Sequence, residues 1–370
     1  MTASRSPTAD KPLAKGWTTG ACAAAAAKAA FTALLGGGFP DPVRIRLPKG
    51  ELPDFPLAET HLEGGVATAA VIKDAGDDPD ITHGATIRAM VRALAPGAGL
   101  RFVAGEGVGT VTRPGLPVPV GEPAINPKPR EIIRDNLAEV AEGFEVPLDL
   151  EVRLSIPGGE ALAAKTWNPR LGIVGGLSVL GTTGIVHPFS CSAWIHSIHR
   201  GIDVARANGF AHIAGSTGST SEDAVQRHYD LPLEALIDMG DFAGGMLKYL
   251  RRHPVPHVTV AGGFAKMVKL SQGNLDLHSA RSQVDLARLA RRAARLGAAA
   301  DLAERIAASN TAAEALGHAR DAGLPLAEAV AAQARDVALA TLAGAAVAPE
   351  VMIVDRAGAI LAVADGGAPS

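Results

Sequence analysis

Residues 16–30 read GWTTGACAAAAAKAA, a glycine-bracketed pair of threonines that runs directly into a block of alanines. Alanine has the highest intrinsic helix propensity, so the sequence predicts a helix over residues 21–35 with Thr18 or Thr19 as its N-cap. Two interpretations of this thin helix stay open. It packs closely against a sheet, or the N–H groups and dipole at its start hold an anionic group.

The same pattern returns at residues 179–189, which read VLGTTGIVHPF and follow a predicted strand. Threonine hydroxyls and backbone N–H groups are donors for an anionic group such as a carboxylate. The repetition favours ligand binding, and six residues become candidates for holding a cofactor: Thr18, Thr19, Gly20, Thr182, Thr183 and Gly184.

Length and composition limit the classes of protein to consider. A chain of 370 residues is long enough for two domains. Its formal net charge of −3 argues against a protein that binds nucleic acid or a membrane surface. With only Cys22 and Cys191, no disulfide framework or structural zinc site is expected. The polar N-terminus lacks an apolar segment, and the helix at 21–35 is too short to span a bilayer, so a cytoplasmic protein is expected.

The first half mixes strands and helices. After an expected disordered tail at residues 1–15, we predict an α+β N-terminal domain over 16–184. Its predicted strands are 43–48, 66–72, 100–103, 108–112 and 148–156, and its further helices are 86–95 and 129–142.

The second half, residues 185–345, is predicted to be an α/β domain of parallel βα units. A helix at 190–208 precedes strands at 210–214, 235–239 and 257–260, and a glycine-rich loop follows each strand. Residues 279–345 are expected to be helical, with breaks near Gly297, Asn310 and Gly323 and with solvated charged faces. Residues 346–370 are predicted to form a β-hairpin that turns at 355–358.

The three glycine-rich loops meet at one sheet edge if the strands are parallel, so they favour a single binding crevice. None has the P-loop pattern or the spaced dinucleotide fingerprint. From the first loop, GSTGST, we take Ser216, Thr217 and Gly218 as further cofactor candidates.

An acidic loop at residues 71–84 reads VIKDAGDDPDITHG. Crowded carboxylates repel, so we expect a raised pKa at one of them, and Asp77, Asp78 and His83 are candidate acids or bases. The alternative is a turn that caps a helix starting near Thr86. His187 is a fourth candidate, and the nearby pair His196 and His199 fits a surface or core helix better than a metal site.

Two loops carry Asn-Pro beside a cation: INPKPR at 125–130 and KTWNPRLGIVGG at 165–176. Asn-Pro favours a turn, and arginine's planar fork suits carboxylates. Ordinary loop charges are the alternative. The candidates for binding a carboxylate-bearing substrate are Asn126, Arg130, Lys165, Asn168 and Arg170.

Six stretches in collinear order, from Gly16 to about Leu316, resemble the cobalt-precorrin-5B C1-methyltransferase family of cobalamin biosynthesis. They are GWTTGACAAAAAKAA, KDAGDDPDITHG, EPAINPKPR, PGGEALAAKTWNPRLGIVGGLSVLGTTGIV, HIAGSTGS and SNTAAEAL. The resemblance implies methyl transfer from S-adenosylmethionine to ring carbon C1 of an anionic tetrapyrrole, giving the precorrin-6A level, with no metal expected. It also implies a CbiD-like fold, an α+β N-terminal domain joined to an α/β C-terminal domain, unlike the usual Rossmann methyltransferase.

One departure from the family lies at Ser190-Cys191-Ser192, where many members carry Ser-Glu-Glu. The change leaves open whether the substrate contains cobalt. Two other functions stay open as well: a non-catalytic tetrapyrrole-binding carrier, and a phosphate-handling transferase suggested by the glycine-rich loops. The alanine-rich helices also permit a homodimer.

Overall fold

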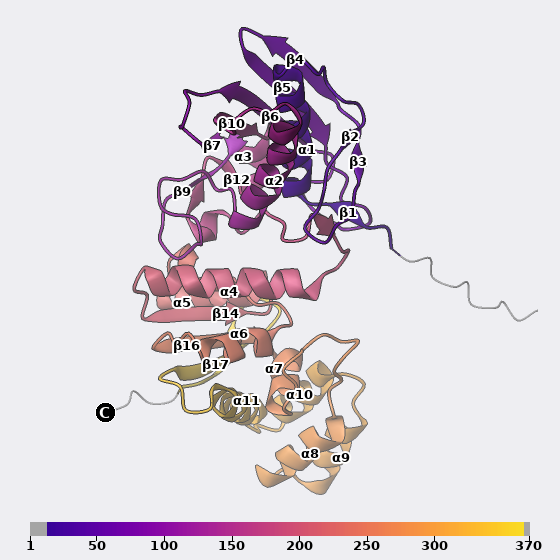
Figure 1. Ribbon diagram of the computed structural model, residues 1–370. Helices are drawn as coiled ribbons and strands as arrows, with labels where there is room; N and C mark the ends of the chain where they lie inside the picture. The colour runs from indigo at the N-terminus through magenta and orange to yellow at the C-terminus, as the bar shows by residue number, and fades with distance from the viewer. Residues whose placement is uncertain (1–12, 366–370) are drawn as a thin grey trace, which may run out of the picture. The chain divides into compact units, whose positions relative to one another are not determined.

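The computed structural model describes residues 13–365, so most of the expected tail at 1–15 and the end of the expected hairpin lie outside the described residues. The chain divides into two compact units (Figure 1). Unit 1 is the chain up to Thr112 together with Pro117–Ser190, and unit 2 is Arg113–Leu116 with the chain from Cys191 onward. The structure thus divides six residues after the expected boundary at Gly184.

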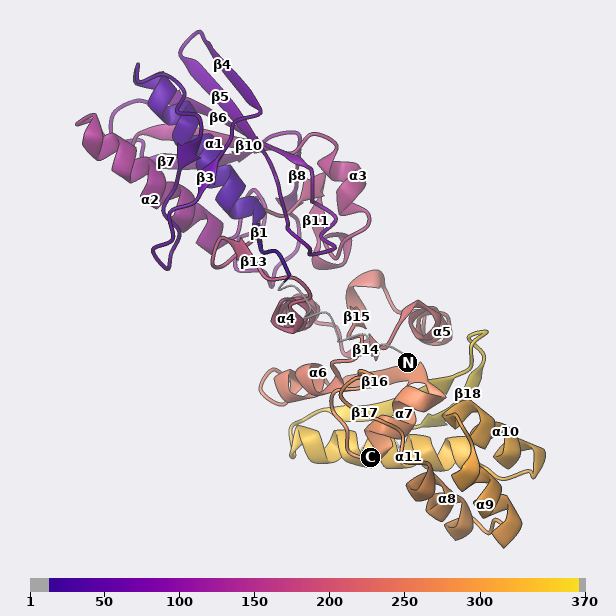
Figure 2. The ribbon, with the colours of Figure 1, turned by 90° about the vertical axis from the view of Figure 1, so that its right-hand side faces the viewer.

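Unit 1 is built on a five-stranded sheet in the order β4-β5-β6-β10-β7 (Figure 2). Strands β7 and β10 are parallel and the other neighbours are antiparallel. The strands are β4 Glu59–Glu63, β5 Val66–Ile72, β6 Thr86–Ala93, β7 Leu100–Ala104 and β10 Leu150–Ser155.

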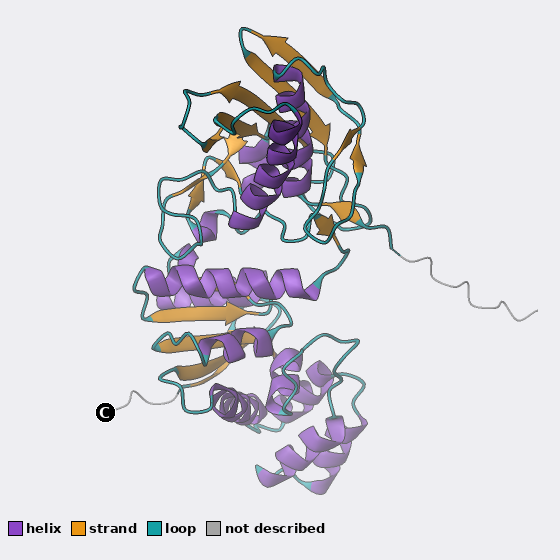
Figure 3. Cartoon of the chain, in the orientation of Figure 1, coloured by secondary structure: helices purple, strands orange, loops and turns teal. Residues whose placement is uncertain are grey.

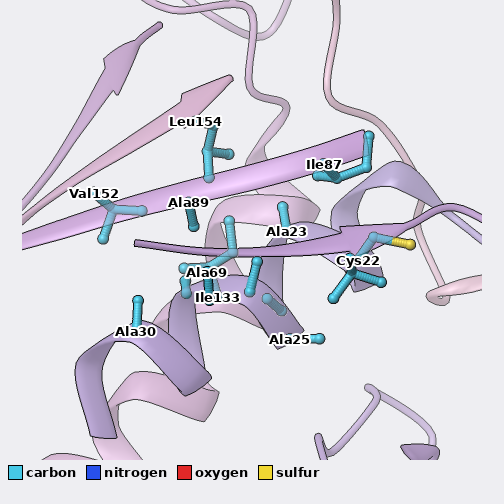
Figure 4. Close-up of a cluster of buried hydrophobic side chains, with 14 of the residues drawn as sticks. Cys22, Ala23, Ala25, Ala30, Ala69, Ile87, Ala89, Ile133, Val152 and Leu154 are labelled. Atoms are coloured by element: carbon cyan, nitrogen blue, oxygen red, sulfur yellow. The ribbon is translucent and has the colours of Figure 1, made fainter. Parts of the chain in front are cut away.

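Two helices, α1 Thr19–Leu34 and α2 Pro127–Gly143, form the core of unit 1 with this sheet. Helix α1 contacts α2, β5 and β6. Every residue from Thr19 to Ala30 except Lys28 is buried. Figure 4 shows its alanines among side chains of the sheet and α2. The predicted helix and its N-cap at Thr18 are confirmed, and the alanines serve close packing.

Short elements surround this core. They are β1 Gly16–Trp17, β2 Val43–Arg44, β3 Asp54–Phe55, β8 Gly107–Val108, β9 Thr110–Val111, α3 Gly159–Ala163, the 3₁₀ turn Pro169–Leu171, β11 Ile173–Val174, β12 Gly176–Leu177 and β13 Ile185–Val186. They form two-stranded ladders, β1 with β13, β2 with β3, β8 with β12 and β9 with β11. The strands predicted at 43–48 and 108–112 are thus present but shorter.

The helix predicted at 86–95 is wrong, because these residues form strand β6. Ile87, Ala89 and Val91 are fully buried while Met90 is exposed, which is the two-residue period of a strand. Pairing with β5 on one side and β10 on the other overrides the helix propensity of its alanine, methionine and arginine residues.

Unit 2 contains a second five-stranded sheet in the order β15-β14-β16-β17-β18 (Figure 3). The first four strands are parallel, and β18 is antiparallel to β17. The strands are β14 His212–Ser216, β15 Leu236–Asp238, β16 His257–Gly263, β17 Ala348–Val354 and β18 Ile360–Ala364. The predicted hairpin therefore forms, but as two strands of this sheet rather than as a separate appendage.

Helices α4 to α6 alternate with the first parallel strands, and α7 to α11 follow one another between β16 and β17. They are α4 Cys191–Ala207, α5 Ser219–Tyr229, the 3₁₀ turn Leu233–Ala235, α6 Ala243–Leu250, α7 Phe264–Ser271, α8 Leu286–Arg295, α9 Ala300–Ala308, α10 Ala312–Asp321 and α11 Leu326–Leu342. The α+β unit followed by an α/β unit is the expected fold class. Within residues 13–365, no helix is both long and apolar enough to cross a bilayer.

Candidate functional site

The two Thr-Thr-Gly turns lie side by side in unit 1. Strand β1 pairs with β13, the Thr18 N–H donates to the Gly184 carbonyl at 2.9 Å, and the Gly20 N–H donates to the Leu180 carbonyl at 3.1 Å. A Cβ at Gly181 would lie 2.3 Å from the Thr18 Cβ, and its φ is +129°. Only glycine permits this approach, so the repeated motif brings two distant segments together.

The start of α1 is largely occupied by the protein itself. The Thr18 hydroxyl accepts the Ala21 N–H at 3.2 Å, and the Gly20 N–H is bound to Leu180 as above. A Cβ at Gly20 would lie 3.0 Å from Pro129 of α2. Thr18 and Thr19 are buried, whereas Thr182 is exposed and Thr183 is half-buried. Of the two paired turns, it is therefore the one at Thr182 and Thr183 that reaches solvent.

The acidic loop connects β5 and β6, next to the paired turns. The Trp17 N–H donates to the Asp74 carbonyl at 2.7 Å, and the Asp77 carboxylate accepts the Ala14 N–H at 2.6 Å. The Asp78 carboxylate accepts the Phe189 N–H at 2.9 Å, two residues beyond the exposed His187. The loop therefore brings its aspartates to the segment that carries His187.

His83 lies in the same loop and is exposed. Its Nδ1 accepts the Ala75 N–H at 3.1 Å, which fixes the tautomer with the proton on Nε2. The alternative expectation, a turn that caps a helix at Thr86, fails because β6 begins there.

A buried ion pair anchors this loop. Lys73 is 1% exposed, and its ammonium binds the Asp80 carboxylate and donates to the Thr82 hydroxyl at 2.7 Å. Burial by itself would raise the pKa of Asp80, but the Lys73 charge and hydrogen bonds from Lys73 and Thr82 hold that pKa below its ordinary value. The pKa of Asp80 is therefore lowered, whereas a raised carboxyl pKa was expected in this loop. Burial raises the pKa of the neighbouring Cys22 thiol to about 12, so that thiol is inert.

Arg130 lies at the start of α2. Its guanidinium donates to the Ile125 carbonyl at 2.8 Å and pairs with Glu122 at 3.2 Å. It also lines a cavity of about 190 Å³ together with Arg134, Glu131, Val118 and prolines 117, 119 and 127. The Asn126 N–H donates to the Val179 carbonyl at 3.0 Å, which ties this loop to the segment that leads into the second threonine motif.

The second cationic loop is held by Asn168, which is buried. Its amide donates to the Gly176 carbonyl at 3.4 Å and its oxygen accepts the Ser178 hydroxyl at 3.1 Å. Lys165 is exposed, and the Arg170 guanidinium lies over the Trp167 ring at 5.9 Å. Asn168 therefore shapes the loop, and the cations are its outward groups.

The third set of cofactor candidates lies in unit 2, where β14 ends. Ser216 is 1% exposed, and its hydroxyl is buried without a hydrogen-bond partner within residues 13–365. Gly218 and Gly263 are the N-caps of α5 and α7, and a Cβ at either would meet no atom within 4 Å. Ser216, Thr217 and Gly218 therefore lie at the carboxyl edge of the parallel sheet of unit 2. The other cofactor candidates belong to unit 1.

A cavity of about 220 Å³ in unit 2 was not expected from the sequence. It is lined by Gln333 and four arginines of α8: Arg288, Arg291, Arg292 and Arg295. Their spacing of three and four residues places them on one helix face, a signal that was interpreted as a solvated charged surface.

Two family models and several named proteins match this chain. Residues 6–188 match the family model described as CbiD, and residues 276–365 match the model described as CbiD, C-terminal domain. A protein of Brucella anthropi named cobalt-precorrin-5B C(1)-methyltransferase is 60% identical over 350 residues, which are 95% of this chain and 95% of that protein. The chain belongs to the CbiD family. The resemblance carried by the six motifs is therefore confirmed.

Two further comparisons concern the CbiD family. A Brucella canis protein with the same name is 60% identical over 347 residues, which are 94% of each chain. A crystal structure titled cobalamin biosynthesis protein CbiD, from Archaeoglobus fulgidus, matches 73% of this chain and 83% of that chain, with 28% identity and a TM-score of 0.40.

Proposed function

We propose that this chain transfers a methyl group from S-adenosylmethionine to C1 of cobalt-precorrin-5B. The observation that carries the proposal is 60% identity, over 95% of the chain, to a protein of that name. Methyl transfer in cobalamin biosynthesis, the function expected from the motifs, is confirmed at the level of the reaction class. S-adenosylmethionine as the donor and the tetrapyrrole as the substrate follow from this class.

When bound, S-adenosylmethionine supplies a methyl group already activated by its sulfonium and leaves as S-adenosylhomocysteine with the C–S electron pair. The protein's part is therefore alignment of the ring carbon with that methyl group, together with removal of the proton that the ring system releases. In unit 1, we look for the proton acceptor among the candidate side chains that face solvent beside the paired turns.

We take His187 as the proton acceptor. Asp77 and Asp78 each accept a backbone N–H, and His83 accepts one at Nδ1, so these three already have a structural task. His187 is exposed, and the bond from Phe189 to Asp78 holds its segment against the acidic loop. Asp78 is then a positioning residue for His187.

The carboxylate arms of the substrate need cations at fixed places. Arg130 and Arg134 share one cavity, and Lys165 and Arg170 extend from the loop that Asn168 shapes. Arginine binds carboxylates through two parallel N–H groups, so we assign the arms to these side chains, with Asn126 fixing the start of α2. The two threonine motifs and the Ser216–Gly218 loop stay the candidates for the donor.

The test is methyl transfer from isotopically labelled S-adenosylmethionine to cobalt-precorrin-5B by purified wild type and by His187→Gln. General base catalysis contributes about 10²- to 10⁴-fold, so the variant should lose at least about 100-fold in kcat. His61→Gln, an exposed histidine on β4, is the control and should keep full activity. Absence of transfer by wild type that still binds the tetrapyrrole would contradict the proposal and favour a carrier.

A further inference from the structure

The donor has two candidate locations in different units, and the geometry distinguishes them. At the paired turns of unit 1, the hydroxyl of Thr18 and the N–H of Gly20 are already engaged with protein groups, and Thr18 and Thr19 are buried. At the carboxyl edge of unit 2, a buried serine hydroxyl has no partner within the described residues. An unpartnered buried hydroxyl costs free energy unless a ligand or a water satisfies it.

That serine lies where the strand order of the sheet reverses. From β14 the chain passes to β15 on one side, and then to β16 on the other side of β14. In open parallel sheets, ligands bind at the carboxyl ends of the two strands that flank such a reversal. Here these strands end at Ser216 and Gly263.

Both strand ends lead into helices without a side-chain cap. Helix α5 begins after Gly218 and α7 begins after Gly263, and neither N-cap residue forms a side-chain hydrogen bond. A Cβ would meet nothing within 4 Å at either glycine. The helix starts therefore offer N–H groups and open space in the same place as the unpartnered hydroxyl.

Asp238 joins this group through the register of the sheet. Ser216 of β14 is paired directly with Asp238 of β15. Two residues earlier on each strand, Ala214 and Leu236 pack in one cluster with Ala224 and Val225 of α5. Since side chains two apart on a strand share a face, Ser216 and Asp238 both face α5.

We infer that the nucleoside part of the methyl donor binds unit 2 at these strand ends, with its ribose hydroxyls on the Asp238 carboxylate and the Ser216 hydroxyl. The inference rests on the proposed function, since the nucleoside is that of the donor. A carboxylate at the end of the strand next to the glycine-rich loop accepts both hydroxyls of a ribose, as in dinucleotide-binding sheets. Asp238 lies 20 residues after Gly218, which agrees with the spacing of about 20 in those proteins.

The test is calorimetric titration of the full chain with S-adenosylhomocysteine. Asp238→Asn should weaken binding by about 10- to 100-fold and Ser216→Ala by about 3- to 10-fold. Asp301→Asn, an exposed carboxylate on α9, should bind like wild type. Ser216→Ala also removes an unsatisfied polar atom, so its melting temperature should equal or exceed that of wild type. Weaker binding without a lower melting temperature would thus show that Ser216 contacts the ligand rather than supporting the fold.

A second titration tests the contact itself. Loss of the ribose 2′-hydroxyl from S-adenosylhomocysteine should weaken binding to wild type, and this difference should largely disappear in Asp238→Asn. Wild-type affinity in both variants, or no binding by wild type, would overturn the inference. Failure of the proposed function is a separate result, because it is measured as absent methyl transfer.

Discussion

Replacing Asp80 by asparagine should destabilise unit 1 strongly, because it leaves the Lys73 ammonium buried without its counter-charge. Lys73 is 1% exposed and Asp80 is partly buried, with 25% of its side chain exposed. Removing one partner of a buried pair costs about 3–5 kcal/mol. Because water reaches part of Asp80, we expect the lower end, about 3 kcal/mol, or about 6–12 °C in melting temperature for a domain of this size.

The assay is urea unfolding followed by tryptophan fluorescence in a Trp194→Phe background, which leaves Trp17 and Trp167 of unit 1 as reporters. Lys73→Met combined with Asp80→Asn should recover at least half of the loss, because no unpaired buried charge remains. Asp54→Asn, which breaks the exposed pair with Arg44, is the control and should leave the midpoint unchanged.

The pH dependence follows from the lowered pKa of Asp80. Its stabilisation is fully present above the unfolded carboxyl pKa of about 4 and is lost as the pH falls through the lower folded value. Asp80→Asn should remove this acid-side loss. A single variant as stable as wild type, or a double variant no better than the single one, would refute the role of the pair.

Three further predictions concern the fold. Gly16→Ala should cost several kcal/mol, on the order of the largest overpacking effects, because its Cβ would lie 2.0 Å from the Ala75 carbonyl carbon. In the control Gly143→Ala, the new Cβ meets no atom within 4 Å, so this variant should be as stable as wild type or more stable. Equal melting temperatures of the two variants would refute this prediction. Phe31→Ala in the α1 core should cost about 3–5 kcal/mol in urea unfolding, and a cost below about 1 kcal/mol would mean that the core is not packed as described. Burial, with the nearby His257, lowers the pKa of His212 to about 4, so stability should fall between pH 6.5 and 4 as the unfolded histidine takes up a proton, and His212→Gln should flatten this part of the stability curve.

The elements with strong local signals were predictable from the sequence. The alanine run, the proline-led helix α2 and the strand at 66–72 carry clear propensity or periodicity, and they appear at or near the predicted bounds. Strand β6 was not predictable, because its residues favour a helix locally and only pairing with β5 and β10 makes it a strand.

The candidate site likewise has a part that the sequence predicts and a part that it does not. Residue types indicated the acidic loop and the cationic loops, but not that Asp80 is engaged by Lys73 or that Asn168 binds its own loop. These contacts depend on which neighbours the fold supplies. Asp238 could be recognised only once the register placed it beside Ser216, since its position in the chain resembles that of any strand end.

The most direct test of the account is the stoichiometry of one reaction: purified full chain, cobalt-precorrin-5B and S-adenosylmethionine with an isotopically labelled methyl group. We predict that S-adenosylhomocysteine forms in equal amount with a product that carries the label at C1. Release of S-adenosylhomocysteine without a labelled ring, or a label on another ring carbon, would contradict it.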